Sequence, residues 1–249
     1  MSKIKTIEGF GLPGAGKSTG ISNLRGDPRL PHSIEIYIRK EGEIASLEGL
    51  HKYSNKTLEI ISELYNTSFY LICRPTFFLS LIKTVYIFGL KRDFISVLRI
   101  LLRALYSRSK VKNSERKRHT ILLDEGLIQY LGALVVNTKT RKQLPESFIK
   151  HVLNNYIEAL LYFEVDYENA IKRISKRNDG LSRIERMNNE KALLNLNKMH
   201  NTFNLCLKLS GELNIPLLIL KNGNSVVENV DSALDFLIRY DKNQLEINS

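Results

Sequence analysis

The nine residues from Gly11 to Thr19, with the sequence Gly-Leu-Pro-Gly-Ala-Gly-Lys-Ser-Thr, constrain the fold more than any other stretch of the chain. A glycine, four further residues and then Gly-Lys-Ser form the spacing of a P-loop. The run Ile4–Phe10 before the loop predicts a strand, and the residues after it can begin a helix. Glycines let backbone N–H groups surround a phosphate, because they add no side chain and adopt positive φ at little cost. The sequence therefore predicts a phosphate-binding loop between a strand and a helix, rather than a glycine-rich turn that binds nothing.

Three kinds of group in this loop are expected to hold a nucleoside triphosphate. The N terminus of the following helix adds its positive dipole end. Lys17 can reach the β- and γ-phosphates, and the hydroxyl of Ser18 can ligate Mg²⁺. The expected nucleotide-binding residues of the loop are Gly11, Pro13, Gly14, Ala15, Gly16, Lys17, Ser18 and Thr19. The cofactors predicted from this loop are ATP and Mg²⁺.

The segment Thr120–Gly126, with the sequence Thr-Ile-Leu-Leu-Asp-Glu-Gly, predicts a buried strand that carries a carboxylate to its tip. Apolar residues that end in an aspartate, about a hundred residues after a P-loop, match the Walker B arrangement. Asp124 is therefore expected to hold Mg²⁺ together with Ser18, directly or through water. The alternative is an ordinary strand end without a metal.

Glu125 follows Asp124 at the predicted strand tip and is a candidate general base for an acceptor hydroxyl. The alternative role is to orient Lys17, an arginine or a Mg²⁺-bound water. Residues Gly126–Val136 predict a helix, and Gln129 lies four residues after Glu125, so both are expected to face one pocket.

Three further strands complete the predicted sheet, at Ser33–Ile38, Ala159–Val165 and Pro216–Leu220. Ser225 and Glu228 form a capping box that begins the last helix, and the polar tail from Asp241 is expected to fray.

Residues of about 50–110 predict a helical insertion between the second and third strands. The run from Phe69 to Leu90 is about as long as a membrane span, but Arg74, Pro75 and Lys83 interrupt it, which argues against a spanning helix. We expect a buried insertion, with a basic amphipathic surface that docks on a membrane or a partner as the alternative. The candidate acceptor-binding residues are Arg39, Arg74 and Gln129.

The chain of 249 residues has a formal net charge of +11, which predicts anionic partners such as nucleotides, nucleic acid or an anionic lipid surface. No signal peptide is expected, because Glu8 and the P-loop interrupt the N-terminal residues. Cys73 and Cys206 form no Cys-x-x-Cys pair, which indicates free thiols in a reducing cytoplasm. The five histidines show no metal-ligand spacing. The expected location is cytoplasmic, with peripheral contact at the inner face of the membrane as an extension. The oligomeric state is open, with a homodimer among the options.

Three features occur in order: the P-loop, the strand-end sequence Asp124-Glu125-Gly126, and an arginine cluster after the fourth strand. Over residues of about 1–38 and 119–240 they resemble the P-loop kinases of the nucleotide and nucleoside kinase group, most nearly the thymidylate-kinase-like branch. In that group a mobile lid carries arginines that close over the ATP phosphates. The resemblance implies a lid at about 173–190. It implies that role for Arg173, Arg177 and Arg183, and it implies adenine contact near Asn222.

The fold that follows is α/β, a three-layer P-loop NTPase fold in a single kinase-like domain over residues 1–249. It has a five-stranded parallel sheet with helices on both faces and the insertion described above. The implied activity is transfer of the ATP γ-phosphoryl group to a small acceptor.

Two departures from the branch argue against thymidylate as the acceptor. Pro13 stands where thymidylate kinases carry an acidic residue, and Asp124-Glu125 replaces their Asp-Arg pair. The preferred acceptor is a nucleoside or sugar hydroxyl, the latter by analogy with kinases of bacterial surface polysaccharide loci. The alternatives are a nucleoside monophosphate kinase, an ATPase switch and a polynucleotide 5′-kinase. The last is opposed by the lack of interleaved aromatic residues in the basic loop 107–118.

Overall fold

The computed structural model describes residues 5–38, 79, 120–124, 126–137, 143–176 and 189–248. Apart from Leu79, the predicted insertion at about 50–110 lies outside the described residues, and so does most of the predicted lid. Five predicted site residues also lie outside: Arg39, Arg74, Glu125, Arg177 and Arg183.

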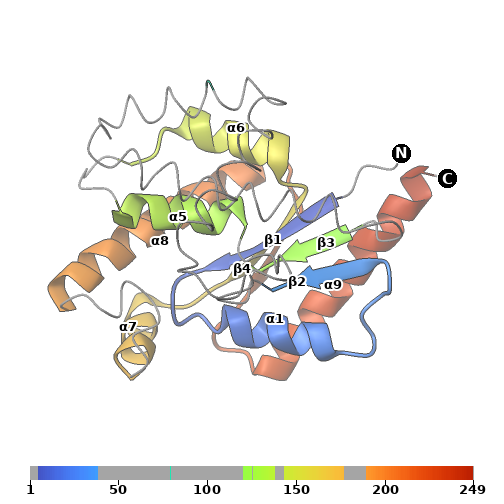
Figure 1. The fold of residues 1–249 in the computed structure, drawn as a ribbon, viewed down its shortest axis with the longest axis horizontal. Coiled ribbons are helices and arrows are strands. Elements are labelled where there is room, and N and C mark those ends of the chain that lie inside the picture. Colours follow the sequence, from blue (N-terminus) through green and yellow to red (C-terminus); the bar gives the residue numbers. More distant parts are fainter. Residues whose placement is uncertain are drawn as a thin grey trace, which may run out of the picture.

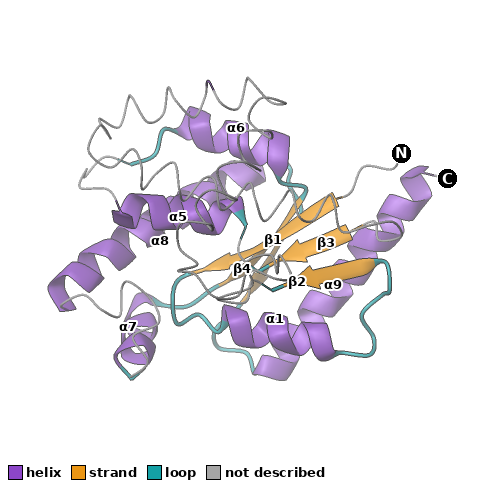
Figure 2. Cartoon of the chain, viewed as in Figure 1, coloured by secondary structure: helices purple, strands orange, loops and turns teal. Residues whose placement is uncertain are grey.

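Five parallel strands form one sheet in the order β2-β3-β1-β4-β5 (Figures 1 and 2). The strands are β1 (Lys5–Gly11), β2 (Ile34–Tyr37), β3 (Thr120–Leu123), β4 (Ala159–Phe163) and β5 (Leu217–Leu220). All five predicted strands are present, and β4 ends two residues before the predicted Val165. The central strand β1 carries the P-loop at its carboxyl end, so the loop lies at the edge where ligands bind in open α/β sheets.

Helices cover both faces of the sheet, which confirms the predicted three-layer α/β architecture (Figure 1). On one face lie α1 (Lys17–Gly26) and α9 (Val226–Asn248), which pack against each other and on β1 and β5. On the other face lie α5 (Leu127–Asn137), α6 (Glu146–Tyr156), α7 (Tyr167–Ser175) and α8 (Asn189–Glu212).

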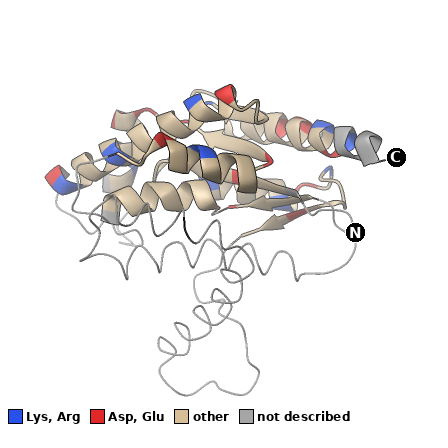
Figure 3. Ribbon diagram, turned by 90° about the horizontal axis from the view of Figure 1, so that it is seen from above, with Lys and Arg blue, Asp and Glu red and all other residues tan. Residues whose placement is uncertain are grey.

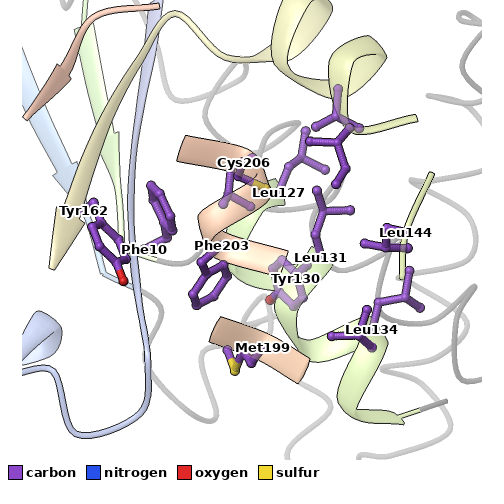
Figure 4. Close-up of a cluster of buried hydrophobic side chains, with 14 of the residues drawn as sticks. Phe10, Leu127, Tyr130, Leu131, Leu134, Leu144, Tyr162, Met199, Phe203 and Cys206 are labelled. Atoms are coloured by element: carbon purple, nitrogen blue, oxygen red, sulfur yellow. The ribbon is translucent and has the colours of Figure 1, made fainter. Parts of the chain in front are cut away.

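The sheet separates two hydrophobic cores, one under each helix layer. In the core under α5 and α8, Phe10 of β1 lies between Tyr162 and Phe203, with ring centroids 5.0 and 5.2 Å away (Figure 4). A Cβ at Gly132 of α5 would lie 2.7 Å from two ring atoms of Phe203, so α5 and α8 approach closely at this glycine. Each fully buried side chain of this size contributes about 1.5–3 kcal/mol to folding. These cores fix β1, and therefore the start of the P-loop, from both sides.

The last helix begins as the sequence predicts and ends later than it predicts. Ser225 and Glu228 form the capping box, with hydrogen bonds from Ser225 N to Glu228 Oε2 (2.6 Å) and from Glu228 N to Ser225 Oγ (3.2 Å). The prediction of fraying from Asp241 is wrong, because α9 continues to Asn248. The Asp241 carboxylate accepts hydrogen bonds from Ser33 Oγ (2.5 Å) and Thr120 Oγ1 (3.2 Å), and the residue is only 5% exposed. These two hydroxyls satisfy the polar group that the sequence alone assigned to solvent.

Acidic and basic residues are interspersed along the described helices (Figure 3). Within the described ranges, no helix combines the length and the apolar character that crossing a membrane requires.

Candidate functional site

The P-loop has the backbone conformation that a phosphate-binding loop needs. Residues Leu12 to Ala15 form a tight turn closed by a hydrogen bond from Ala15 N to Leu12 O (3.0 Å). Pro13 and Gly14 occupy its centre, and Gly14 has φ 85°, the arrangement preferred in a type II turn. Gly16, with φ 83°, is the N-cap of α1. The first N–H groups of α1 have no acceptor within the helix, so they are directed at whatever binds before its N terminus.

Two glycines of the loop are required by close packing as well as by conformation. A Cβ at Gly11 would lie 2.6 Å from the carbonyl oxygen of Phe163 on β4. A Cβ at Gly14 would lie 3.1 Å from the carbonyl oxygen of Ala170 on α7. The loop is therefore held against β4 and α7, and larger residues would move it away from them.

Lys17 and Asp124 meet at the mouth of the loop. The Lys17 ammonium donates to the Asp124 carbonyl oxygen (2.7 Å) and to the Asp124 carboxylate. Their side chains are only 11% and 8% exposed. The Asp124 N–H donates to the carbonyl oxygen of Tyr37 (3.1 Å), which ties the tip of β3 to β2. The structure thus brings the lysine predicted to bind phosphate next to the carboxylate predicted to bind Mg²⁺, although the two residues lie 107 positions apart in the sequence.

Ser18 and Thr19 are exposed residues in the first turn of α1. The Ser18 hydroxyl and the Asp124 carboxylate are the hard oxygen donors that Mg²⁺ prefers, so the residue types fit this cation. The described residues contain no group of three or more His, Cys, Asp or Glu side chains that could hold a metal by themselves.

Arg173 joins the P-loop to the loop after β5. Its Nη1 donates to the carbonyl oxygen of Gly14 (3.0 Å), and its Nη2 donates to Asn222 Oδ1 (2.6 Å). The residue lies on α7, whose N-cap is Asp166, and the Asp166 side chain accepts from Asn169 N (2.8 Å). This backbone hydrogen bond lowers the pKa of Asp166 below its usual value. Three of the predicted nucleotide-binding residues are therefore in direct contact, and Arg173 binds main chain here.

Gln129 also contacts the P-loop main chain. Its Oε1 accepts the N–H of Gly11 (3.1 Å), although the sequence predicts a role in acceptor binding. One residue earlier in α5, the N–H of Ile128 donates to Glu8 Oε2 (3.0 Å). Glu8 lies in the middle of β1 and is 0% exposed. Sequence reasoning did not assign Glu8 to the site, although a carboxylate within the strand before a P-loop was a visible signal.

The fold matches that of solved kinase structures. The structure of deoxyadenosine kinase from M. mycoides with bound dATP is 18% identical, with a TM-score of 0.51, and the match covers 93% of this chain and 98% of that one. The structure of that enzyme with products dCMP and a flexible dCDP bound is 19% identical, with a TM-score of 0.50 and coverage of 96% and 99%. No protein-family model and no curated protein matches the sequence. The chain therefore has the fold of the P-loop nucleoside kinases, the group that its motifs resemble.

Proposed function

We propose that this protein is an ATP- and Mg²⁺-dependent kinase that transfers the γ-phosphoryl group to a hydroxyl of a small acceptor, with nucleosides as the first candidates. The observation that carries the proposal is the contact between Lys17 and Asp124 at the N terminus of α1. A phosphate-binding lysine and a metal-binding carboxylate have to meet beside a helix N terminus for this chemistry. The likeness to deoxyadenosine kinase supports a nucleoside as the acceptor.

The loop binds phosphate through main-chain N–H groups, the dipole of α1 and Lys17. On ATP binding the Lys17 ammonium exchanges the Asp124 carboxylate for phosphate oxygens, because both anions compete for one cation. The Asp124 carboxylate and the Ser18 hydroxyl would then hold Mg²⁺. When bound, Mg²⁺ neutralises charge on the phosphate oxygens.

The proposed base is Glu125, the residue between Asp124 and Gly126. A hydroxyl acceptor loses its proton during transfer, so a carboxylate at this position can accept it. A phosphate acceptor is already an anion and needs no base. The Asp-Glu pair therefore supports an alcohol over a nucleoside monophosphate. Arg173, Arg177 and Arg183 of the proposed lid would stabilise the charge that spreads over the transferred group.

A sugar hydroxyl in surface polysaccharide synthesis is a second proposed acceptor, and it rests on analogy alone. The nucleoside has the additional support of the structural likeness. Two alternatives remain. An ATPase switch would use Glu125 to polarise water, and a polynucleotide 5′-kinase would bind the nucleic acid backbone through the positive charges that give the chain its net charge of +11.

An acceptor panel with ATP and Mg²⁺ tests the proposal. The panel contains deoxyadenosine, deoxycytidine, thymidine, dCMP, dTMP, free sugars and a 5′-hydroxyl oligonucleotide, and ADP release is measured against a reaction without acceptor. We expect ADP release above that rate with at least one nucleoside, and loss of the signal in the Lys17→Ala variant. Equal release with and without every acceptor would identify an ATPase. Activity confined to dCMP or dTMP would contradict a hydroxyl acceptor.

A further inference from the structure

Two side-chain hydrogen bonds tie the first turn of α5 to β1. Gln129 of the helix accepts from the Gly11 N–H of the strand (3.1 Å). In the reverse direction, Glu8 of the strand accepts from the Ile128 N–H of the helix (3.0 Å). The two bonds involve neighbouring residues on α5 and are three residues apart on β1. Together they fix both the distance and the register between the helix start and the strand that leads into the P-loop.

Gly126 adds a third constraint at the same place. A Cβ on Gly126 would lie 2.1 Å from Cδ and 2.3 Å from Oε2 of Glu8. Such distances are far below any van der Waals contact, so the chain passes directly over the Glu8 carboxylate and only glycine fits there. In the sequence, Asp124, Glu125 and Gly126 connect β3 to α5. Contact with the Glu8 carboxylate therefore fixes where Gly126 crosses β1.

Asp124 is held by the hydrogen bond from its N–H to the Tyr37 carbonyl oxygen, and by the Lys17 ammonium, which donates to the Asp124 carbonyl oxygen. In the sequence, Glu125 lies between Asp124 and Gly126, the two residues that these contacts hold. A carboxylate buried at 0% exposure costs more desolvation free energy than an apolar side chain of the same size. An apolar residue at position 8 would be enough to pack α5 on β1. The carboxylate adds a hydrogen bond that fixes the start of α5. The start of α5 compensates part of the desolvation cost, because a helix N terminus attracts negative charge.

The role of Gln129 in this arrangement is that of an acceptor. A backbone N–H can only donate, so the amide atom that faces Gly11 has to be the oxygen. A glutamate at position 129 would keep this bond and lose both amide donors. A methionine would keep the length of the side chain and lose the bond.

We propose that Glu8 and Gln129 are positioning residues for phosphoryl transfer, which hold Gly126 and the start of α5 at a fixed place relative to the P-loop without touching either substrate. The proposal rests on the proposed kinase function. It replaces the acceptor-binding role that the sequence predicts for Gln129. Misplacement of a reacting group by about 1 Å can cost about 10²-fold in rate, so the effect of releasing Gly126 and the start of α5 is measurable.

Two variants of Gln129 separate positioning from substrate contact. At saturating ATP and acceptor, Gln129→Met is expected to lower kcat by about 10–100-fold, with ATP affinity changed little. Gln129→Glu is expected to keep most of kcat, because it retains the acceptor oxygen. Any repulsion between the new charge and ATP would appear in KM. Amide hydrogen exchange at Gly11 gives a readout that needs no activity. It should accelerate by about tenfold in Gln129→Met and stay slow in Gln129→Glu.

Matched variants test Glu8 in the same assays. Glu8→Gln keeps shape and an acceptor oxygen, and is expected to keep the protection of the Ile128 amide and most of kcat. Glu8→Met is expected to lose the protection of the Ile128 amide and most of kcat.

The results that would overturn or narrow the proposal can be distinguished from one another. Wild-type kcat in Gln129→Met, with an active wild type, would remove the positioning role. Equal loss in Gln129→Glu and Gln129→Met, with Gly11 still protected in the former, would make Gln129 a substrate contact. Wild-type kcat in Glu8→Met would limit the positioning role to Gln129. If Glu8→Met does not fold, the Glu8→Gln variant decides, and loss of kcat in Glu8→Gln would contradict a positioning role for Glu8. A wild type without acceptor-dependent turnover would overturn the kinase function itself.

Discussion

Lys17 is expected to contribute to stability as well as to phosphate binding, because it holds the nearly buried Asp124. We predict that Lys17→Ala lowers acceptor-dependent turnover by at least about 10²-fold. The variant should still fold, but it should lose about 1–3 kcal/mol, since the Asp124 carboxylate loses a charged partner. ADP release and thermal melting of Lys17→Ala, Asp124→Asn and the double variant measure both effects. If the two side chains act as a pair, the double variant melts higher than the sum of the single losses implies. Retained turnover in a folded Lys17→Ala protein contradicts the phosphate role.

Arg173 donates to the Gly14 carbonyl oxygen and to Asn222, so its guanidinium lies beside the loop that is proposed to hold the phosphates. We predict that Arg173→Ala lowers turnover more than it weakens ATP binding, the pattern expected for a group that acts mainly in the transition state. Steady-state kinetics and ATP titration separate the two quantities. Lys176→Ala is the matched control, because it removes one positive charge from an exposed position at the end of the same helix. Equal kinetics of both variants would make Arg173 an ordinary surface arginine.

The proposed role of Glu125 as a base predicts which class of acceptor the site uses. We predict that Glu125→Gln, which keeps the shape and removes the base, lowers phosphoryl transfer by about 10²–10⁴-fold and leaves nucleotide binding nearly unchanged. Single-turnover transfer to the acceptor identified in the panel is the measurement. A variant that transfers phosphate at the wild-type rate would exclude Glu125 as the base. A phosphate acceptor, such as a nucleoside monophosphate, would then be favoured over a hydroxyl.

Single site residues differ in how much of their placement the sequence could predict. The P-loop residues were predictable because their spacing is local and the chemistry dictates the glycines. Asp124 was predictable because a parallel strand delivers its last residue to the ligand edge. The contacts of Gln129 and Glu8 were not, because they depend on how α5 packs on β1 across more than a hundred residues of sequence. Glu125, Arg177 and Arg183 lie outside the described residues, and their roles stay predictions.

At the scale of elements, buried strands were more predictable than helices. Runs such as Thr120–Leu123 and Ala159–Phe163 are apolar on both faces because helices cover both, and such runs stand out in a sequence. The helices α6 and α8 were not predicted, although the buried residues of α6 recur at helical spacing: Phe148, Ile149, Val152, Leu153 and Tyr156. The fraying predicted from Asp241 was wrong because the two hydroxyls that satisfy this carboxylate lie more than a hundred residues away.

The two hydrogen bonds that join Asp241 of α9 to the sheet give a prediction about stability alone. Asp241 accepts from Ser33 and Thr120 at the amino ends of β2 and β3, on the side of the sheet opposite the P-loop. Asp241→Ala should lower the free energy of unfolding by about 1–3 kcal/mol, since it leaves a buried hydroxyl without its acceptor. Turnover below the melting transition should stay at the wild-type value. Denaturant unfolding with parallel kinetics tests this, and the exposed Asp235→Ala on the same helix is the control. A change in kcat without a change in stability would contradict the structural role.

Across the whole molecule, the positive charge is unevenly distributed along the chain. Residues 39–119 contain sixteen Lys and Arg against seven Asp and Glu, a surplus of nine of the eleven net charges. The rest of the chain has a net charge of only two, and both signs are interspersed on the described helices (Figure 3). A nucleotide site uses only a few basic residues, so the surplus calls for another anionic partner. The apolar stripes that accompany it between Phe77 and Arg103 favour an anionic membrane surface over nucleic acid.

This predicts reversible, salt-sensitive binding of the full chain to anionic vesicles. Each basic residue near such a surface contributes about 1 kcal/mol, so replacing Arg116, Lys117 and Arg118 by Gln should weaken partitioning by about 10²-fold. The matched control replaces three exposed residues of the described helices and their ends, Lys176, Lys208 and Arg239, by Gln. This removes the same charge elsewhere on the protein. Flotation with phosphatidylserine-containing and neutral vesicles at low and high salt is the measurement. Equal loss in both variants would mean that only net charge matters, because long-range attraction does not depend on which residues carry it. Binding that is absent, or equal for neutral vesicles, would contradict membrane docking and leave residues of about 50–110 as a buried insertion.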